Sequence, residues 1–168
     1  HSFPTRRSSD LEWAASGVVN PGLLQRLLAD PYFAKAPPKS TGRDLFSVAW
    51  LQGHLAGFER LPAVDVQATL AELTIGPCVY CIDSYQKNSK LLVVCGGGAF
   101  NLHLMRGLQR QLPQLKVVAS EALGLPPLQV EAAAFAWLAR RAIRGETGNL
   151  QSVTGARGTR VLGAIYPA

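Results

Sequence analysis

The chain has little of several features that would assign it to a special class. Its 168 residues include only 3 cysteines, too few for the disulfide framework of a small secreted domain. No apolar run approaches the about 18 residues that a membrane span needs, and no basic segment followed by an apolar one opens the sequence in the manner of a secretory leader. We therefore expect a cytoplasmic protein, with no membrane as a partner.

Acidic residues are also scarce, at 11 against 17 lysines and arginines, which gives a net charge of +6. The positive side chains are scattered singly along the expected helices, except for the group Arg140, Arg141 and Arg144. Nucleic-acid-binding proteins usually cluster basic residues on one face. A solvated basic helix face is the simpler interpretation, so no nucleic acid is expected as a partner.

Two of the cysteines, Cys78 and Cys81, have the C-x-x-C spacing of redox pairs and of half a zinc site. A zinc site needs about four ligands, and the other thiol, Cys95, and the histidines His54 and His103 lie far apart in sequence. We expect the pair to pack as small, weakly polar residues on one side of its segment. No metal site is predicted.

The first eleven residues resemble the conceptual translation of a widely used sequencing adapter. Such a non-native leader is excluded from fold reasoning. Phe3 and Leu11 are its only large apolar residues, too few to offset an ordering cost of about 1–2 kcal/mol per residue. We expect residues 1–11 to be unpacked, and we expect the natural sequence, from near Glu12 onward, to be a fragment of a longer protein.

The spacing of apolar residues alternates between helical and extended patterns. It predicts helices over 21–28, 48–57, 101–112 and 127–144, and strands over 91–94, 115–119 and 160–166. Asp65 is predicted to cap a further helix over 66–73, which Gly76 and Pro77 are expected to interrupt, and 36–44 is predicted to be a surface loop. The β-α-β-α order of the second half predicts an α/β fold with a mainly parallel sheet and flanking helices.

The predicted helix over 127–144 is rich in alanine. Its alanines at 132, 133, 134, 136 and 139 form a surface with little side chain, which would let the helix lie close to a sheet or another helix. Phe135 and Trp137 are expected in the core. Glu131, in the first turn, is either a partner of the helix dipole or a ligand contact.

The most informative segment is the predicted strand over 91–94, which stops at Gly96, Gly97 and Gly98 before a helix begins near Asn101. Glycine permits a tight turn and leaves no Cβ in the way of a ligand. The free N–H groups at the start of the following helix suit phosphate or ribose oxygens. A nucleotide site is the first hypothesis, and tight packing of the helix on the sheet is the structural alternative.

A dinucleotide fingerprint is only partly present at this turn. It requires G-x-G-x-x-G and an acidic residue about 20 residues further on. Asn101 stands where the third glycine should be, whereas Glu121 does follow a predicted strand. A NAD-dependent dehydrogenase therefore stays open as an alternative.

Many short motifs, taken in their order and spacing, resemble the anhydro-N-acetylmuramic acid kinases, bacterial enzymes of the sugar kinase, Hsp70 and actin superfamily. The resemblance covers nearly all of 12–168. Its stretches are 13–17, 38–46, 65–74, 94–101, 126–127, 131–139 and 153–167. Between residues 74 and 90 the sequence departs from the family pattern, which has a regular amphipathic helix there.

The resemblance implies a kinase that uses ATP and Mg²⁺ to phosphorylate 1,6-anhydro-N-acetylmuramic acid. Opening of the anhydro ring would give N-acetylmuramic acid 6-phosphate during peptidoglycan recycling. The resemblance further implies that 12–168 is the C-terminal, nucleotide-binding lobe of an RNase H-like fold. The family's catalytic aspartate and phosphate loop would then lie upstream of Trp13, so the isolated chain is expected to be inactive.

The resemblance also implies roles for particular residues. It assigns Gly96, Gly97, Gly98 and Asn101 to a loop on the adenosine side. Glu131 is our candidate for contact with the sugar substrate. The loop residues Lys39, Ser40, Thr41 and Arg43 resemble a family loop and are further candidates. A homodimer is compatible with this interpretation, and a non-catalytic, sugar-kinase-like binding module is a further alternative.

Overall fold

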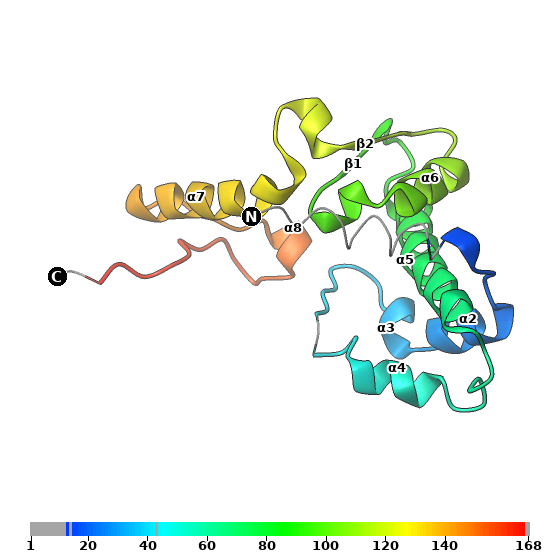
Figure 1. Cartoon of the computed structure of the whole chain (residues 1–168). Helices are drawn as coiled ribbons and strands as arrows, with labels where there is room; N and C mark the ends of the chain where they lie inside the picture. The colour runs from blue at the N-terminus through cyan, green and yellow to red at the C-terminus, as the bar shows by residue number, and fades with distance from the viewer. Residues whose placement is uncertain (1–12, 14, 43, 167–168) are drawn as a thin grey trace, which may run out of the picture.

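The computed structural model describes residues 13, 15–42 and 44–166, so the leader over 1–11 lies outside the described residues. The described chain combines helices with a small parallel sheet, which confirms the α/β class (Figure 1). Its helices are α2 (Pro21–Leu28), α3 (Pro31–Ala34), α4 (Val48–His54), α5 (Ala63–Tyr85), α6 (Leu102–Gln111), α7 (Val130–Ile143) and α8 (Gln151–Thr154). The strands are β1 (Leu91–Val94) and β2 (Lys116–Ala119), and the 3-10 helices are η1 (Gly97–Phe100), η2 (Ser120–Leu123) and η3 (Pro127–Gln129).

Local capping chemistry sets where α2 and α6 begin. The side-chain oxygen of Asn20 accepts a hydrogen bond from Leu23 N at 2.9 Å, and Pro21 occupies the first turn of α2. Asn101 caps α6 in the same way, through Leu104 N at 2.9 Å. These side chains satisfy backbone donors that the first turn of a helix leaves free. The predicted helices at both places are confirmed.

Two predictions about α5 were wrong. Pro62, rather than Asp65, is the N-cap residue, and Asp65 Oδ1 instead accepts the N–H of Val18 at 2.8 Å. The helix also runs through Pro77 for 23 residues. Proline removes a backbone hydrogen bond, but α5 is held on both sides of it, by Ile75, which is 1% exposed, and by Asp83, which accepts from Gln114 at 3.2 Å.

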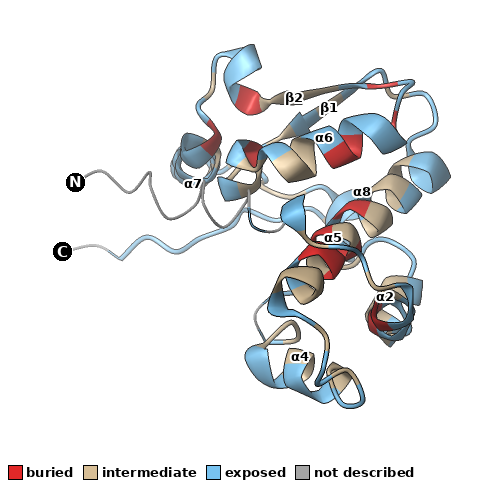
Figure 2. Cartoon of the chain, turned by 45° about the vertical axis from the view of Figure 1, so that its right-hand side comes forward, coloured by how far each residue is buried: buried red, intermediate tan, exposed pale blue. Residues whose placement is uncertain are grey.

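The core lies where α2 crosses α5. Leu23 and Leu27 of α2 are fully buried and form a cluster with Leu73 of α5. Figure 2 shows buried residues along both helices. A polar link lies at the same crossing, because Thr69 of α5, 0% exposed, accepts the N–H of Asn20 at 2.9 Å and donates to Asp65 O at 2.7 Å.

Replacing Thr69 by valine is expected to lower the free energy of unfolding by about 1–3 kcal/mol, because valine matches the shape but leaves the Asn20 N–H without its partner. Urea denaturation measures the loss. Thr74→Val is the matched control on the same helix, since Thr74 is exposed and, among the described residues, its hydroxyl donates only to Leu70 O, at 3.0 Å. Its change should stay within about 0.5 kcal/mol, and equal losses at the two positions would contradict the role given to Thr69.

The sheet pairs β1 with β2 in parallel, in a register that runs from Leu91 opposite Lys116 to Val94 opposite Ala119. Helix α6 makes the crossover between the two strands. The β-α-β order is thus confirmed. The strand predicted over 160–166 was wrong: this segment is exposed coil, and its Arg160 carbonyl accepts one backbone bond, from Gly148 N at 2.9 Å. An extended pattern forms a strand only beside a partner edge.

Helix α7 extends away from the α2–α5 core (Figure 1). The helix was predicted correctly, but its predicted burial was wrong, since Phe135 is 64% and Trp137 48% exposed and the alanine surface is also exposed. Helix α7 contacts η3, and Leu138 of α7 and Leu162 of the C-terminal segment both lie close to Gly148. Among the described residues, no helix is both long and apolar enough to cross a membrane.

Candidate functional site

The glycine turn, defined here as Gly96, Gly97 and Gly98, connects β1 to η1 and then to α6. Gly96 has a φ of 70°, in the left-handed region that favours glycine. Its N–H donates to the carbonyl of Pro127 at 2.9 Å, which ties the turn to η3. The predicted order of strand, glycine turn and helix is confirmed, with a short 3-10 helix inserted before α6.

Gly98 needs a different explanation from Gly96. Its φ is not positive, and a Cβ built on it would meet no atom of the described chain within 4 Å. Neither backbone conformation nor packing within the described chain therefore requires glycine at this position. Gly98 borders a cavity of about 460 Å³ between α5, β1 and α6. The open space beside the turn suits the close approach of a bound molecule.

Asn101 is partly occupied by its structural role. Its side-chain oxygen accepts the capping hydrogen bond of α6, which leaves its amide N–H₂ group and one oxygen lone pair for a ligand. Free backbone N–H groups in the first turn of α6 lie at the positive end of its dipole. The turn can therefore interact with oxygen atoms of a nucleotide through main-chain groups.

The predicted loop residues border a different cavity. Lys39 and Thr41 line a space of about 700 Å³ between α3, α4 and α5. Lys39 Nζ donates to the carbonyls of Tyr32 at 3.2 Å and Phe33 at 3.1 Å, and Ser40 is exposed. Arg43 lies outside the described residues. The loop itself was predicted correctly.

The two cavities meet α5 at shared residues, Thr74, Cys78 and Cys81, yet the glycine turn contributes only to the smaller one. The structure thus does not bring the loop over 39–42 and the glycine turn into one site. Cys78 is exposed and Cys81 half-buried, so the two cysteines border cavities rather than filling a packed core.

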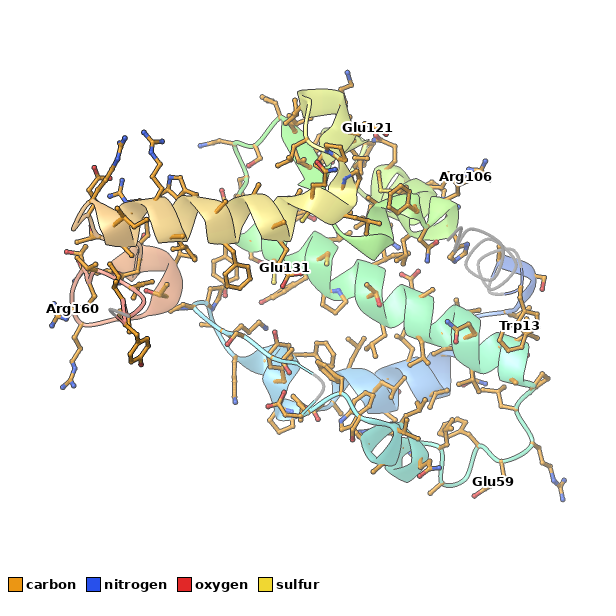
Figure 3. All side chains as sticks on the ribbon, turned by 60° about the vertical axis from the view of Figure 1, so that its left-hand side comes forward. Trp13, Glu59, Arg106, Glu121, Glu131 and Arg160 are labelled. Carbon is orange, nitrogen blue, oxygen red and sulfur yellow. The ribbon has the colours of Figure 1, made fainter. Side chains whose placement is uncertain are left out.

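Two acidic residues lie in segments that are connected to the glycine turn or that follow the same end of the sheet. Glu131 lies exposed in the first turn of α7, directly after η3, whose Pro127 holds Gly96 (Figure 3). Glu121 lies in η2, just past the end of β2. Val94 pairs with Ala119. Glu121 and the glycine turn therefore both lie just beyond the carboxyl ends of the two parallel strands.

A hydrogen-bonded pair that the sequence did not predict positions a side chain in the wall of the larger cavity. Asp30 Oδ1 accepts the N–H of Tyr32 at 2.8 Å, and its Oδ2 accepts the indole N–H of Trp50 at 2.9 Å. These two hydrogen bonds, the backbone one first, hold the pKa of Asp30 below its usual value. The Asp30-Pro31 step indicated a helix boundary, but no local signal pointed to an indole 20 residues away.

The described residues hold no group of three or more histidine, cysteine, aspartate or glutamate side chains that could bind a metal ion.

The family model for anhydro-N-acetylmuramic acid kinase matches residues 5–168. A kinase of that name from Variovorax paradoxus is 66% identical, over 93% of this chain and 42% of the relative. Its counterparts from Albidiferax ferrireducens and Pseudomonas putida are 59% and 51% identical, over 95% of this chain in both cases and over 41% and 44% of the relatives. The chain therefore spans less than half the length of these relatives.

Proposed function

Because the chain belongs to the anhydro-N-acetylmuramic acid kinase family, we propose that it forms the nucleotide-binding, C-terminal lobe of a kinase that uses ATP. In the whole protein the phosphoryl acceptor is 1,6-anhydro-N-acetylmuramic acid, whose anhydro ring opens to give N-acetylmuramic acid 6-phosphate. Mg²⁺ accompanies the nucleotide and neutralises phosphate charge. The catalytic aspartate and the phosphate loop belong to a part of the family's sequence outside 13–168.

The observation that carries the nucleotide assignment is the open space at Gly98, at the end of a parallel strand. In open α/β sheets, ligands bind beyond the carboxyl ends of the strands. A glycine that the chain's own backbone and packing do not need is readily explained by a ligand lying against it. In this proposal the main chain of the glycine turn contacts the adenosine part of ATP.

Glu131 is the proposed contact on the sugar side. It lies exposed in the first turn of α7, and η3 connects this helix to the glycine turn through the Gly96–Pro127 hydrogen bond. The loop residues Lys39 and Thr41 fit a contact with the sugar less well, since they border a cavity that the glycine turn does not line. We therefore leave the loop out of the proposed sugar site.

The position of Glu121 favours one alternative, a dehydrogenase-like dinucleotide site. In such sites an acidic residue at the end of the second strand holds a ribose hydroxyl, and Glu121 lies in η2, just past the end of β2. Parallel titrations with ATP and NADH separate the two functions. A clear preference for NADH would contradict the kinase assignment.

Replacing Gly98 by alanine is expected to weaken binding of a non-hydrolysable ATP analogue by at least about tenfold, or about 1.4 kcal/mol. The methyl group would occupy the space that the proposal gives to the nucleotide. The folded chain itself has room for it, so the melting temperature should be unchanged or slightly raised. Isothermal titration calorimetry and thermal unfolding measure the two effects.

Gly53→Ala is the matched control, because Gly53 lies exposed on α4 and a Cβ there also meets no atom within 4 Å. It should stabilise the protein by about 0.5–1 kcal/mol without changing affinity for the analogue. The proposal is contradicted if Gly98→Ala binds the analogue as well as the unsubstituted chain does, or if the unsubstituted chain does not bind it.

A further inference from the structure

The larger cavity, between α3, α4 and α5, is a binding site in its own right: we propose that it takes a small aromatic molecule that carries one anionic group. The glycine turn does not line this cavity, although three residues of α5, Thr74, Cys78 and Cys81, line both cavities. The proposal does not depend on the proposed nucleotide site. Its volume, about 700 Å³, lies within the range of about 300–1,000 Å³ that is common for small-molecule pockets.

Aromatic rings form one wall of the cavity. The Phe46 ring meets the rings of Tyr32 and Trp50 edge to face, with centroid separations of 5.5 and 5.0 Å, and lies 5.6 Å from that of Phe33. All four side chains line the cavity, and apolar residues of α5, such as Leu70 and Leu73, line it as well. Such a wall favours a flat, apolar ligand that can stack or pack edge to face.

Polar contacts hold this wall in place, so the site is ordered before a ligand arrives. The Trp50 indole is fixed by Asp30 on one side, and its ring lies 4.3 Å from that of His54 on the other. His54 Nδ1 is in turn 2.8 Å from Trp50 O. A wall that is already ordered reduces the entropy lost on binding.

Lys39 supplies the charge that selects the ligand's polar group. Among the described residues that line the cavity, it is the one with a charged side chain. Its ammonium group lies 4.9 Å from the centroid of the Tyr32 ring and donates to two backbone carbonyls. An ammonium has three donors, so one N–H remains for a carboxylate or sulfonate. Thr41 also lines the cavity and adds a hydroxyl group.

The probe for this site is anilinonaphthalene sulfonate, a fluorescent dye that combines aromatic rings with one anionic group. We expect the chain to bind it with enhanced fluorescence. Lys39→Met, which removes the charge but keeps an apolar side chain of similar length, should weaken binding about tenfold, and Lys39→Arg should restore most of it. Phe46→Leu should weaken binding as well. Circular dichroism checks that each variant is folded.

Phe135→Leu is the matched control, because Phe135 lines a separate apolar cavity between α7 and the C-terminal segment. Dye affinity should not change in this variant, and an excess of the ATP analogue should not displace the dye. Unchanged affinity in Lys39→Met, or loss of binding in Phe135→Leu alone, would overturn the proposal. Displacement by the ATP analogue would place the dye at the glycine turn and would likewise overturn it.

Discussion

Leu27→Ala is expected to lower the free energy of unfolding by about 2–5 kcal/mol, the range typical of a fully buried leucine. Leu27 is 0% exposed and packs with Leu23 and Leu73 where α2 crosses α5. Removal of its branched end costs the transfer free energy of the lost carbons and leaves a cavity between the two helices. Urea denaturation followed by circular dichroism measures the change.

Leu28→Ala is the control for this prediction, because it alters the same residue type on the same helix at a position that is 38% exposed. We expect a loss of less than about 1 kcal/mol, in line with substitutions away from the core. Similar losses at the two positions would show that the α2–α5 contact does not hold the core together.

The leucine pattern also shows what sequence periodicity can and cannot predict. Leucines at 23, 24, 27 and 28 predicted a helix with one apolar side, and α2 covers the predicted residues. The structure buries Leu23 and Leu27 fully but leaves Leu28 exposed. Periodicity identifies the apolar side of a helix, whereas the position of α5 decides which part of that side is covered.

Features that depend on neighbouring residues were predicted well. The glycine turn and the start of a helix near Asn101 follow from local backbone chemistry, although the one cap predicted from the sequence, Asp65, was wrong. Predictions that depend on distant partners were less successful. Pro77 was expected to interrupt α5, but packing against α6 and the Gln114–Asp83 hydrogen bond keep the helix continuous.

The candidate site shows the same contrast between features set by neighbouring residues and features set by distant ones. The glycine turn could be predicted, but the separation between Gly98 and the loop of Lys39 could not, because it arises from the path of α5 between two cavities. The Asp30–Trp50 hydrogen bond joins residues far apart in sequence and had no local signal. Helix α7 was predicted to be covered, yet the described chain covers Phe135 and Trp137 only in part and leaves them 64% and 48% exposed.

The chain of 168 residues is expected to show no measurable ATP consumption with 1,6-anhydro-N-acetylmuramic acid. The proposed function places the catalytic base and the phosphate loop outside 13–168. General-base assistance alone contributes about 10²–10⁴-fold to such a rate, and phosphate positioning adds to it. A coupled assay of ADP release, with and without the sugar, measures this.

Joining residues 12–168 to the N-terminal part of the Variovorax paradoxus kinase, which is 66% identical in the matched region, should give turnover that depends on the sugar. The same fusion with Gly98→Ala should show a raised KM for ATP, which connects the activity to the glycine turn. Sugar-dependent turnover by the isolated chain would show instead that its catalytic base lies within the chain. Glu131 and Asp44 would then be the first residues to replace, and the assignment of the chemistry to the rest of the family's sequence would be wrong.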